Sequence, residues 1–210
     1  LMIVIAIIGI LAAIAIPQFM SYRVRANNTS AAALAKVTVS SLAALNSDLA
    51  CYGVSESGFN LTNTCPGGSG AGTPLLGSGA ALPAATAASL GAMVTGTNNT
   101  GAGPVISGVG FTVPNGCDLL VSTEGVNNAT YQVISEHANG NRAFGVEAEL
   151  ADVMYFVQNE TWNGAAAIDC TAPPTLTAPG VTSGLDFDPT GTDLGVAGGG
   201  QPTGNWHIMR

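Results

Sequence analysis

Four side chains near the end of the sequence carry oxygen atoms at the spacing of a calcium-binding loop. They lie in the segment DFDPTGTD (186–193), where Gly191 stands at the position of a sharp turn. The match ends at loop position 12, because Ala197 replaces the expected bidentate acid. The segment predicts a Ca²⁺ site, with an Asx-rich turn that needs no metal as the alternative, and no other cofactor is expected. The predicted ligands are Asp186, Asp188, Thr190 and Asp193.

The four cysteines offer a second kind of chemistry. None of them has CxxC or CxxCH spacing, which argues against zinc ribbons, thioredoxin-type redox motifs and covalent haem attachment. An even number of cysteines in a chain with an export-like N-terminus predicts two disulfides formed outside the cytosol. Of the three possible pairings, we favour Cys51–Cys65 and Cys117–Cys170, because each closes a segment with few other constraints. In the chain-entropy model they contribute about 3 and about 4 kcal/mol.

Asn-X-Ser/Thr triplets are the sequence signal for N-linked glycosylation, and several occur in this chain. Such triplets arise often by chance in a sequence rich in Asn and Thr, and O-linked sugars on the Ser/Thr-rich loops are an equal alternative. Two of the triplets begin at Asn27 and Asn28. The candidate glycosylation sites are Asn60, Asn98, Asn128 and Asn159.

The common catalytic signatures are missing from the sequence. It has no Walker loop, no nucleophile elbow and no HExxH motif. His137 and His207 have no Cys, Asp or Glu cluster at metal-ligand spacing. We therefore expect a protein that is not an enzyme.

Charge is sparse and unevenly distributed along the chain. Charged residues are 9% of the sequence, against about 25% in typical soluble domains. The net charge is −8, to which residues 1–53 contribute +2 (three basic, one acidic) and residues 54–210 contribute −10 (two basic, twelve acidic). Because nucleic-acid binding depends on basic surfaces that neutralise phosphates, we expect no nucleic acid as a main partner.

The element that begins the chain is strongly apolar. Residues 1–16 carry no charge and no strongly polar side chain. As a helix they rise about 24 Å, slightly less than the ~30 Å hydrocarbon core of a bilayer. This segment predicts a membrane-grade helix, with a secretory signal peptide as the alternative.

The helical pattern continues beyond this segment. After Pro17 neither Gly nor Pro occurs until Gly53, and a narrow apolar stripe runs along the stretch. Residues 1–52 would form a rod about 78 Å long, too long to be buried in one small domain. Gly9 and Pro17 both weaken a helix, so the stretch between them should bend or melt most easily, with a simple kink as the alternative. The stripe residues are Leu34, Thr38, Leu42, Leu45 and Leu49.

The segment LMIVIAIIGILAAIAIPQFMSYRVRA (1–26) resembles the N-terminal signature of bacterial type IV pilins, of the type IVa kind. The rest of the chain resembles that family only in layout. In the family a leader peptidase cuts before a methylated N-terminal residue, and a glutamate precedes the position held here by Leu1. Since both are absent, the resemblance implies that the first five mature residues are missing from this sequence.

The resemblance also implies a function. The subunit would wait in the inner membrane, and the pilus assembly machinery would then move it into an extracellular filament of identical subunits. In this family the stretch that corresponds to Gly9–Pro17 is often unwound in the fibre. Such filaments serve adhesion, twitching motility, DNA uptake or other surface interactions. The residues expected to pack in the filament core are Leu1, Ile3, Ile5, Ala6, Ile8, Gly9, Leu11, Ala12, Ala13, Ile16, Phe19 and Tyr22.

The expected fold is α+β, with a long N-terminal helical spine packed under a small antiparallel β-sheet head with long loops, as in type IV pilins. The head should contain strands at 104–113 and 117–123 and a hairpin over 130–149 whose turn is ANGN. Alternate residues on the two sides of that turn should share a face, which are Tyr131, Val133 and Ser135 before it and Phe144, Val146 and Ala148 after it. A short helix is expected near 83–93, and 150–162 fits either a strand or a short helix. The predicted parts are a spine at 1–53 (apolar half 1–22, amphipathic half 23–53), a variable loop region at 54–103, a sheet head at 104–170 and a loop-rich tail at 171–210.

Two other functions remain compatible with the sequence. A pseudopilin of type II secretion would share the opening helix but usually has a smaller head. A membrane protein with one spanning helix and a ligand-binding extracytoplasmic head is the alternative from a different class.

Overall fold

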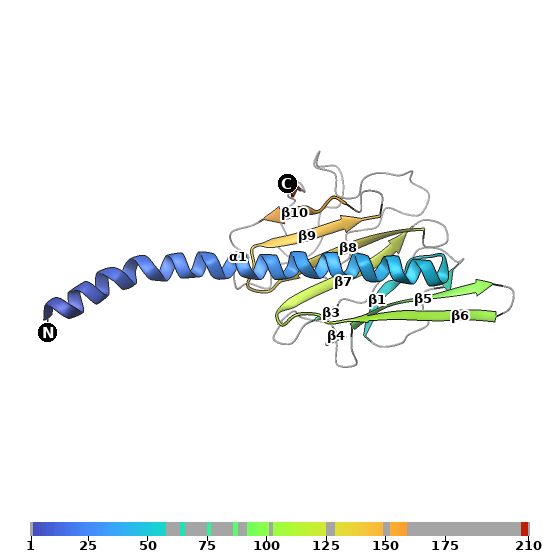
Figure 1. The fold of residues 1–210 in the computed structure, drawn as a ribbon, viewed down its shortest axis with the longest axis horizontal. Coiled ribbons are helices and arrows are strands. Elements are labelled where there is room, and N and C mark those ends of the chain that lie inside the picture. The colour runs from blue at the N-terminus through green and yellow to red at the C-terminus, as the bar shows by residue number, and fades with distance from the viewer. Residues whose placement is uncertain are drawn as a thin grey trace.

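The computed structural model describes residues 2–57, 64–65, 75–76, 86–87, 92–100, 103–124, 129–148, 152–158 and 207–209. In this part of the chain, one long N-terminal helix packs with its second half against two β-sheets, and its first half extends beyond them (Figure 1). The expected α+β arrangement of a long helix on antiparallel sheets is therefore confirmed.

The helix α1 runs without interruption from Met2 to Leu49, with Pro17 inside it. Every residue of the predicted stripe is buried, and the Thr38 hydroxyl donates to the Leu34 carbonyl oxygen at 2.9 Å. Ala50 follows the last helical residue, has a positive φ of 56° and donates its N–H to the Asn46 carbonyl oxygen at 2.8 Å. This is the left-handed conformation that commonly terminates helices, here adopted by a residue other than glycine.

The larger sheet lies across the second half of α1. Its strand order is β11-β10-β9-β8-β7-β3-β4. The three longest strands, β7, β8 and β9, pair antiparallel with their neighbours in this group. The predicted strand at 117–123 and the predicted hairpin are confirmed as β7, β8 and β9, and the segment that fitted either element contains strand β10. The strands are β3 (Leu75–Leu76), β4 (Thr86–Ala87), β7 (Cys117–Glu124), β8 (Thr130–His137), β9 (Arg142–Glu147), β10 (Tyr155–Gln158) and β11 (His207–Ile208).

The smaller sheet lies beside the C-terminal end of α1 and is built around one strand, β5. Strand β6 pairs along the whole of β5, while β1 and β2 share its other edge. The predicted strand at 104–113 is confirmed as β6. The strands are β1 (Val54–Ser57), β2 (Thr64–Cys65), β5 (Ala92–Thr100) and β6 (Gly103–Phe111).

Two expectations for residues 54–103 are wrong for the residues that the structure describes there. The region is not only loop, because β1 and β5 belong to it and β5 is one of the longest strands. The expected helix near 83–93 is contradicted by Thr86–Ala87, which form β4, and by Ala92–Met93, which begin β5. Pairing with neighbouring strands supplies the backbone hydrogen bonds there, and it outweighs the helix propensity that the alanines give this segment.

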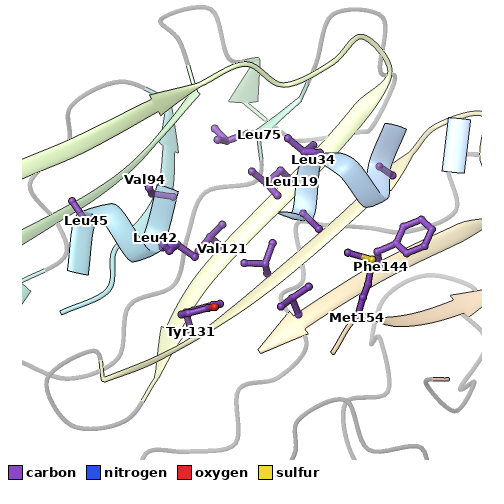
Figure 2. Close-up of a cluster of buried hydrophobic side chains, with 14 of the residues drawn as sticks. Leu34, Leu42, Leu45, Leu75, Val94, Leu119, Val121, Tyr131, Phe144 and Met154 are labelled. Atoms are coloured by element: carbon purple, nitrogen blue, oxygen red, sulfur yellow. The ribbon is translucent and has the colours of Figure 1, made fainter. Parts of the chain in front are cut away.

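One hydrophobic cluster joins the helix to both sheets. Figure 2 shows Leu34 and Leu42 of α1 together with Val94 of β5, Leu119 of β7 and Phe144 of β9. The alternation predicted for β8 and β9 is present, since Tyr131, Val133, Phe144 and Val146 all belong to this cluster. This cluster covers only the second half of the spine.

Candidate functional site

The first half of α1 exposes apolar side chains on all sides. Ile7 and Ile8 are 52% and 60% exposed although they are adjacent, so no single face of the helix is covered. The helix is long and apolar enough to cross a membrane, and none of its most apolar stretch is buried in the fold. Figure 1 shows this half extending away from the sheets. It is the largest apolar surface among the described residues.

The size of this surface requires a partner. Thirteen large hydrophobic side chains between Met2 and Tyr22 are exposed. Covering each of them is worth about 1.5–3 kcal/mol, so leaving all of them in water would cost at least about 20 kcal/mol. That exceeds the typical 5–15 kcal/mol stability of a domain. The segment therefore needs lipid or other protein around it.

The structure places the predicted filament-core residues together on this half-helix. Eleven of the twelve are described, and ten of these are exposed while Ala12 is half-buried. Leu1 lies outside the described residues. Gly9 and Pro17 lie within a continuous helix, and a Cβ added at Gly9 would have no atom of the described part of the chain within 4 Å. The predicted unwinding between these two residues concerns the assembled state and stays a prediction.

A group of polar contacts fixes the point where the spine meets the head. Asn27 Nδ2 donates to the Asn139 carbonyl oxygen at 2.9 Å, and Asn28 Nδ2 donates to Asn141 Oδ1 at 2.8 Å. Farther along, the Ser135 hydroxyl of β8 donates to the Ala31 carbonyl oxygen at 2.8 Å. These contacts hold the β8–β9 turn against α1, so the apolar half projects from a fixed base.

Sequence reasoning missed the role of this junction. Asn27 and Asn28 were noted only as the first residues of glycosylation triplets, but Asn28 is 8% exposed and bonded inside the protein. The one signal in the sequence is that Asn27 and Asn28 are two adjacent polar residues in a predicted helix. Helical periodicity alone cannot indicate which turn they meet.

The cysteines depart from the predicted pairing. Cys117 carries a free thiol, so the predicted Cys117–Cys170 disulfide is not formed. Its side chain is fully buried under α1, where Sγ lies 3.5 Å from the Ser30 hydroxyl. Burial raises the pKa of the Cys117 thiol, the Ser30 contact lowers it, and the Asp118 charge raises it further. Sequence spacing cannot reveal that this thiol is packed under the helix.

Cys51 is disulfide-bonded. Cys117 is not the partner of Cys51, because its thiol is free. Strand β2, which ends at Cys65, pairs with Thr97–Asn98 on the edge of β5 that β1 also occupies. Because Cys51 precedes β1 by three residues, this backbone register favours the predicted Cys51–Cys65 bond. The pairing stays a prediction.

Most of the other predicted sites lie outside the described residues. The calcium ligands Asp186, Asp188, Thr190 and Asp193 lie outside the described residues, as do the glycosylation candidates Asn60, Asn128 and Asn159. Asn98 lies within β5, between β2 and β6. Within the described ranges, no group of three or more His, Cys, Asp or Glu side chains could hold a metal ion.

Comparison with protein-family models, with curated proteins and with solved structures found no significant match.

Proposed function

We propose that this chain is the structural subunit of an extracellular filament of the type IV pilus kind, with the fold of a type IV pilin. The observation that carries the proposal is the exposed apolar half of α1, which needs a non-aqueous environment that the head does not supply. Before assembly the inner membrane provides it, and in the filament a bundle of the same segments from identical subunits provides it.

The transfer between these two environments changes hydration little, because lipid tails are as apolar as the side chains of a bundle. Packing must therefore supply the preference for the filament. Small residues allow the backbones of neighbouring helices to approach closely. Ala6, Gly9, Ala12 and Ala13 place such residues among the large Ile and Leu side chains of the segment.

The head supplies the outer surface of the filament. It is joined to the spine by the Asn27–Asn28 contacts and by the apolar cluster, so pulling on the head transmits force to the buried segment. A leader peptidase and the pilus assembly machinery are the partners that this function requires. Its activity is assembly rather than catalysis.

Negative-stain microscopy of material sheared from the cell surface tests the proposal. We expect long fibres that contain this chain, identified by antibody labelling or mass spectrometry. Ile8→Arg should abolish them because it places a charge in the helix bundle, whereas Ile8→Leu should preserve them. A chain found only as monomers in the membrane fraction would overturn the proposal in favour of a ligand-binding membrane protein. Short periplasmic assemblies without surface fibres would favour a pseudopilin.

A further inference from the structure

A groove of about 910 Å³ runs along the base of the head, between α1 and the edge of the larger sheet. Its helical wall extends from Met20 to Lys36, and its other wall includes Arg142 at the start of β9 and Gln158 at the end of β10. Sixteen helical steps rise about 24 Å. The groove is therefore long enough for about seven residues of extended chain.

The groove is basic in a protein that is otherwise acidic. Arg25, Lys36 and Arg142 line it, which is three of the five basic residues of the whole chain. Among the described residues that line the groove there is no Asp or Glu. Such a concentration of one sign of charge favours an anionic occupant.

Arg142 is a fixed cation in the wall of the groove. Its Nε donates to Gln158 Oε1 at 2.7 Å, and its guanidinium carbon lies 4.7 Å from the centre of the Phe156 ring. The guanidinium group thus loses little further freedom when a carboxylate binds it. Arg25 and Lys36 are exposed on the facing wall.

We propose that this groove binds an acidic surface segment of a second copy of this chain. The inference rests on the proposed filament, which brings heads of −10 charge side by side. Such heads repel one another unless the acids of one copy meet cations of the next. The groove presents those cations along one continuous surface.

Two other anionic occupants fit the groove less well. Lys36 lies 20 helical residues beyond Ile16, about 30 Å along the axis, so a lipid headgroup at the membrane surface does not reach it. Nucleic acid is repelled by the net charge of −8 that the chain carries. An acidic segment of a second copy matches both the positive charge of the groove and its length.

Carbodiimide cross-linking of sheared fibres identifies the occupant, because the reagent joins an amine to a carboxylate in direct contact and Lys36 is the one lysine in the sequence. We expect a ladder of covalent dimers and larger products, with Lys36 joined to an Asp or Glu in peptide maps. Lys36→Arg keeps the charge but removes the reactive amine, so its fibres should give no ladder. A Lys36 bond within a single copy, or no Lys36 product, would overturn the proposal.

Charge reversal at two neighbouring positions provides a matched comparison. Arg25→Glu changes a groove residue, and Arg23→Glu makes the same change at an exposed position outside the groove. We expect at least a tenfold loss of fibres with Arg25→Glu and a change below twofold with Arg23→Glu. Equal effects would overturn the groove proposal while the filament proposal stands. No fibres from the unaltered chain would overturn both.

Discussion

Asn28 and Asn141 bond to each other twice across 113 residues of sequence. Asn28 Nδ2 donates to Asn141 Oδ1 at 2.8 Å, and the Asn141 backbone N–H donates to Asn28 Oδ1 at 3.1 Å. Both residues are buried, and a Cβ added at Gly140 would lie 2.6 Å from Asn28 Oδ1. The pair fastens the β8–β9 turn to α1 at the point where the helix leaves the head.

Asn28→Ala should lower the free energy of unfolding by about 2 kcal/mol, because it leaves the buried Asn141 N–H without its acceptor. Thermal unfolding of the full chain in detergent micelles measures the effect. Thr29→Ala is the matched control, since its exposed hydroxyl bonds only within the helix and should change stability by less than about 0.5 kcal/mol. Equal effects of the two changes would show that the pair does not fasten the turn.

Asp118 should make stability depend on pH. Its carboxyl group is fully buried, neither oxygen has a hydrogen-bond partner among the described residues, and Glu136 is its cross-strand neighbour. Desolvation raises the pKa of Asp118 from 3.8 to about 7. The folded chain therefore holds a proton that the unfolded chain releases between these values, so stability falls as pH rises through this window, by about 4 kcal/mol at most.

Unfolding of the full chain between pH 4 and pH 8 measures this slope. Asp118→Asn removes the titrating group, so the fall in stability with rising pH should disappear. A slope of the opposite sign remains from His137, because burial lowers the pKa of its imidazole and stability is then lost as pH falls. Asp152→Asn is the control, because Asp152 is exposed and its removal should leave the slope unchanged. A fall in stability with rising pH that persists in Asp118→Asn would assign the effect to another group.

The elements that could be predicted from the sequence are those with regular apolar spacing. The stripe from Leu34 to Leu49 predicts the buried face of α1, and the alternation around a turn rich in Asn and Gly predicts β8 and β9. Strand β5 has the sequence AMVTGTNNT, which is mostly small and polar, so no period distinguishes it from a loop. It becomes a strand because β1 and β6 pair with its two edges, and its own residues carry no apolar period that predicts this pairing.

The candidate site could be predicted only in its apolar part. A charge-free run can be recognised without a partner from elsewhere in the chain, so the apolar half at 1–22 could be predicted from composition alone. The groove combines Arg25 and Lys36 of α1 with Arg142 of β9, more than 100 residues away. Nothing in the spacing of these cations indicates that they share one surface, because the register of β9 against α1 is set by the fold.

Cys117 should react only after unfolding. Its thiol is buried and its pKa is raised by desolvation, so the reactive thiolate is scarce in the native protein. Without reductant, iodoacetamide should leave Cys117 unmodified in the native chain and alkylate it after denaturation. A disulfide-linked peptide that joins Cys117 to Cys170 would contradict this expectation and restore the pairing predicted from sequence. The same peptide map should contain Cys51 joined to Cys65.

Ala50→Gly should stabilise the protein by about 0.5–1 kcal/mol. Ala50 ends α1 with a φ of 56°, a conformation that a Cβ disfavours and glycine accepts readily. Ala44→Gly is a control with the opposite expected sign, since Ala44 is exposed inside α1 and glycine there costs about 1 kcal/mol. Thermal unfolding of both variants tests the assignment, and a loss of stability in Ala50→Gly would contradict it.

Gly9→Ala and Pro17→Ala test whether the helix must unwind when the filament forms. Gly9 has open space around it, so alanine strengthens the helix by about 1 kcal/mol without disturbing the head. Pro17→Ala restores a backbone hydrogen bond and strengthens the helix by about 3 kcal/mol. If the stretch between them unwinds in the fibre, both variants oppose assembly, with Pro17→Ala the stronger.

The two variants also separate unwinding from close helix packing. Gly9→Ala adds a methyl group that could hinder the approach of a neighbouring helix, whereas Pro17→Ala removes bulk from the helix surface. We therefore expect sheared fibre yield to fall in both variants, by about fivefold or more for Pro17→Ala, while the amount of chain in the membrane fraction is unchanged. Normal fibres from Pro17→Ala together with few from Gly9→Ala would contradict unwinding, because only the added methyl group would then matter.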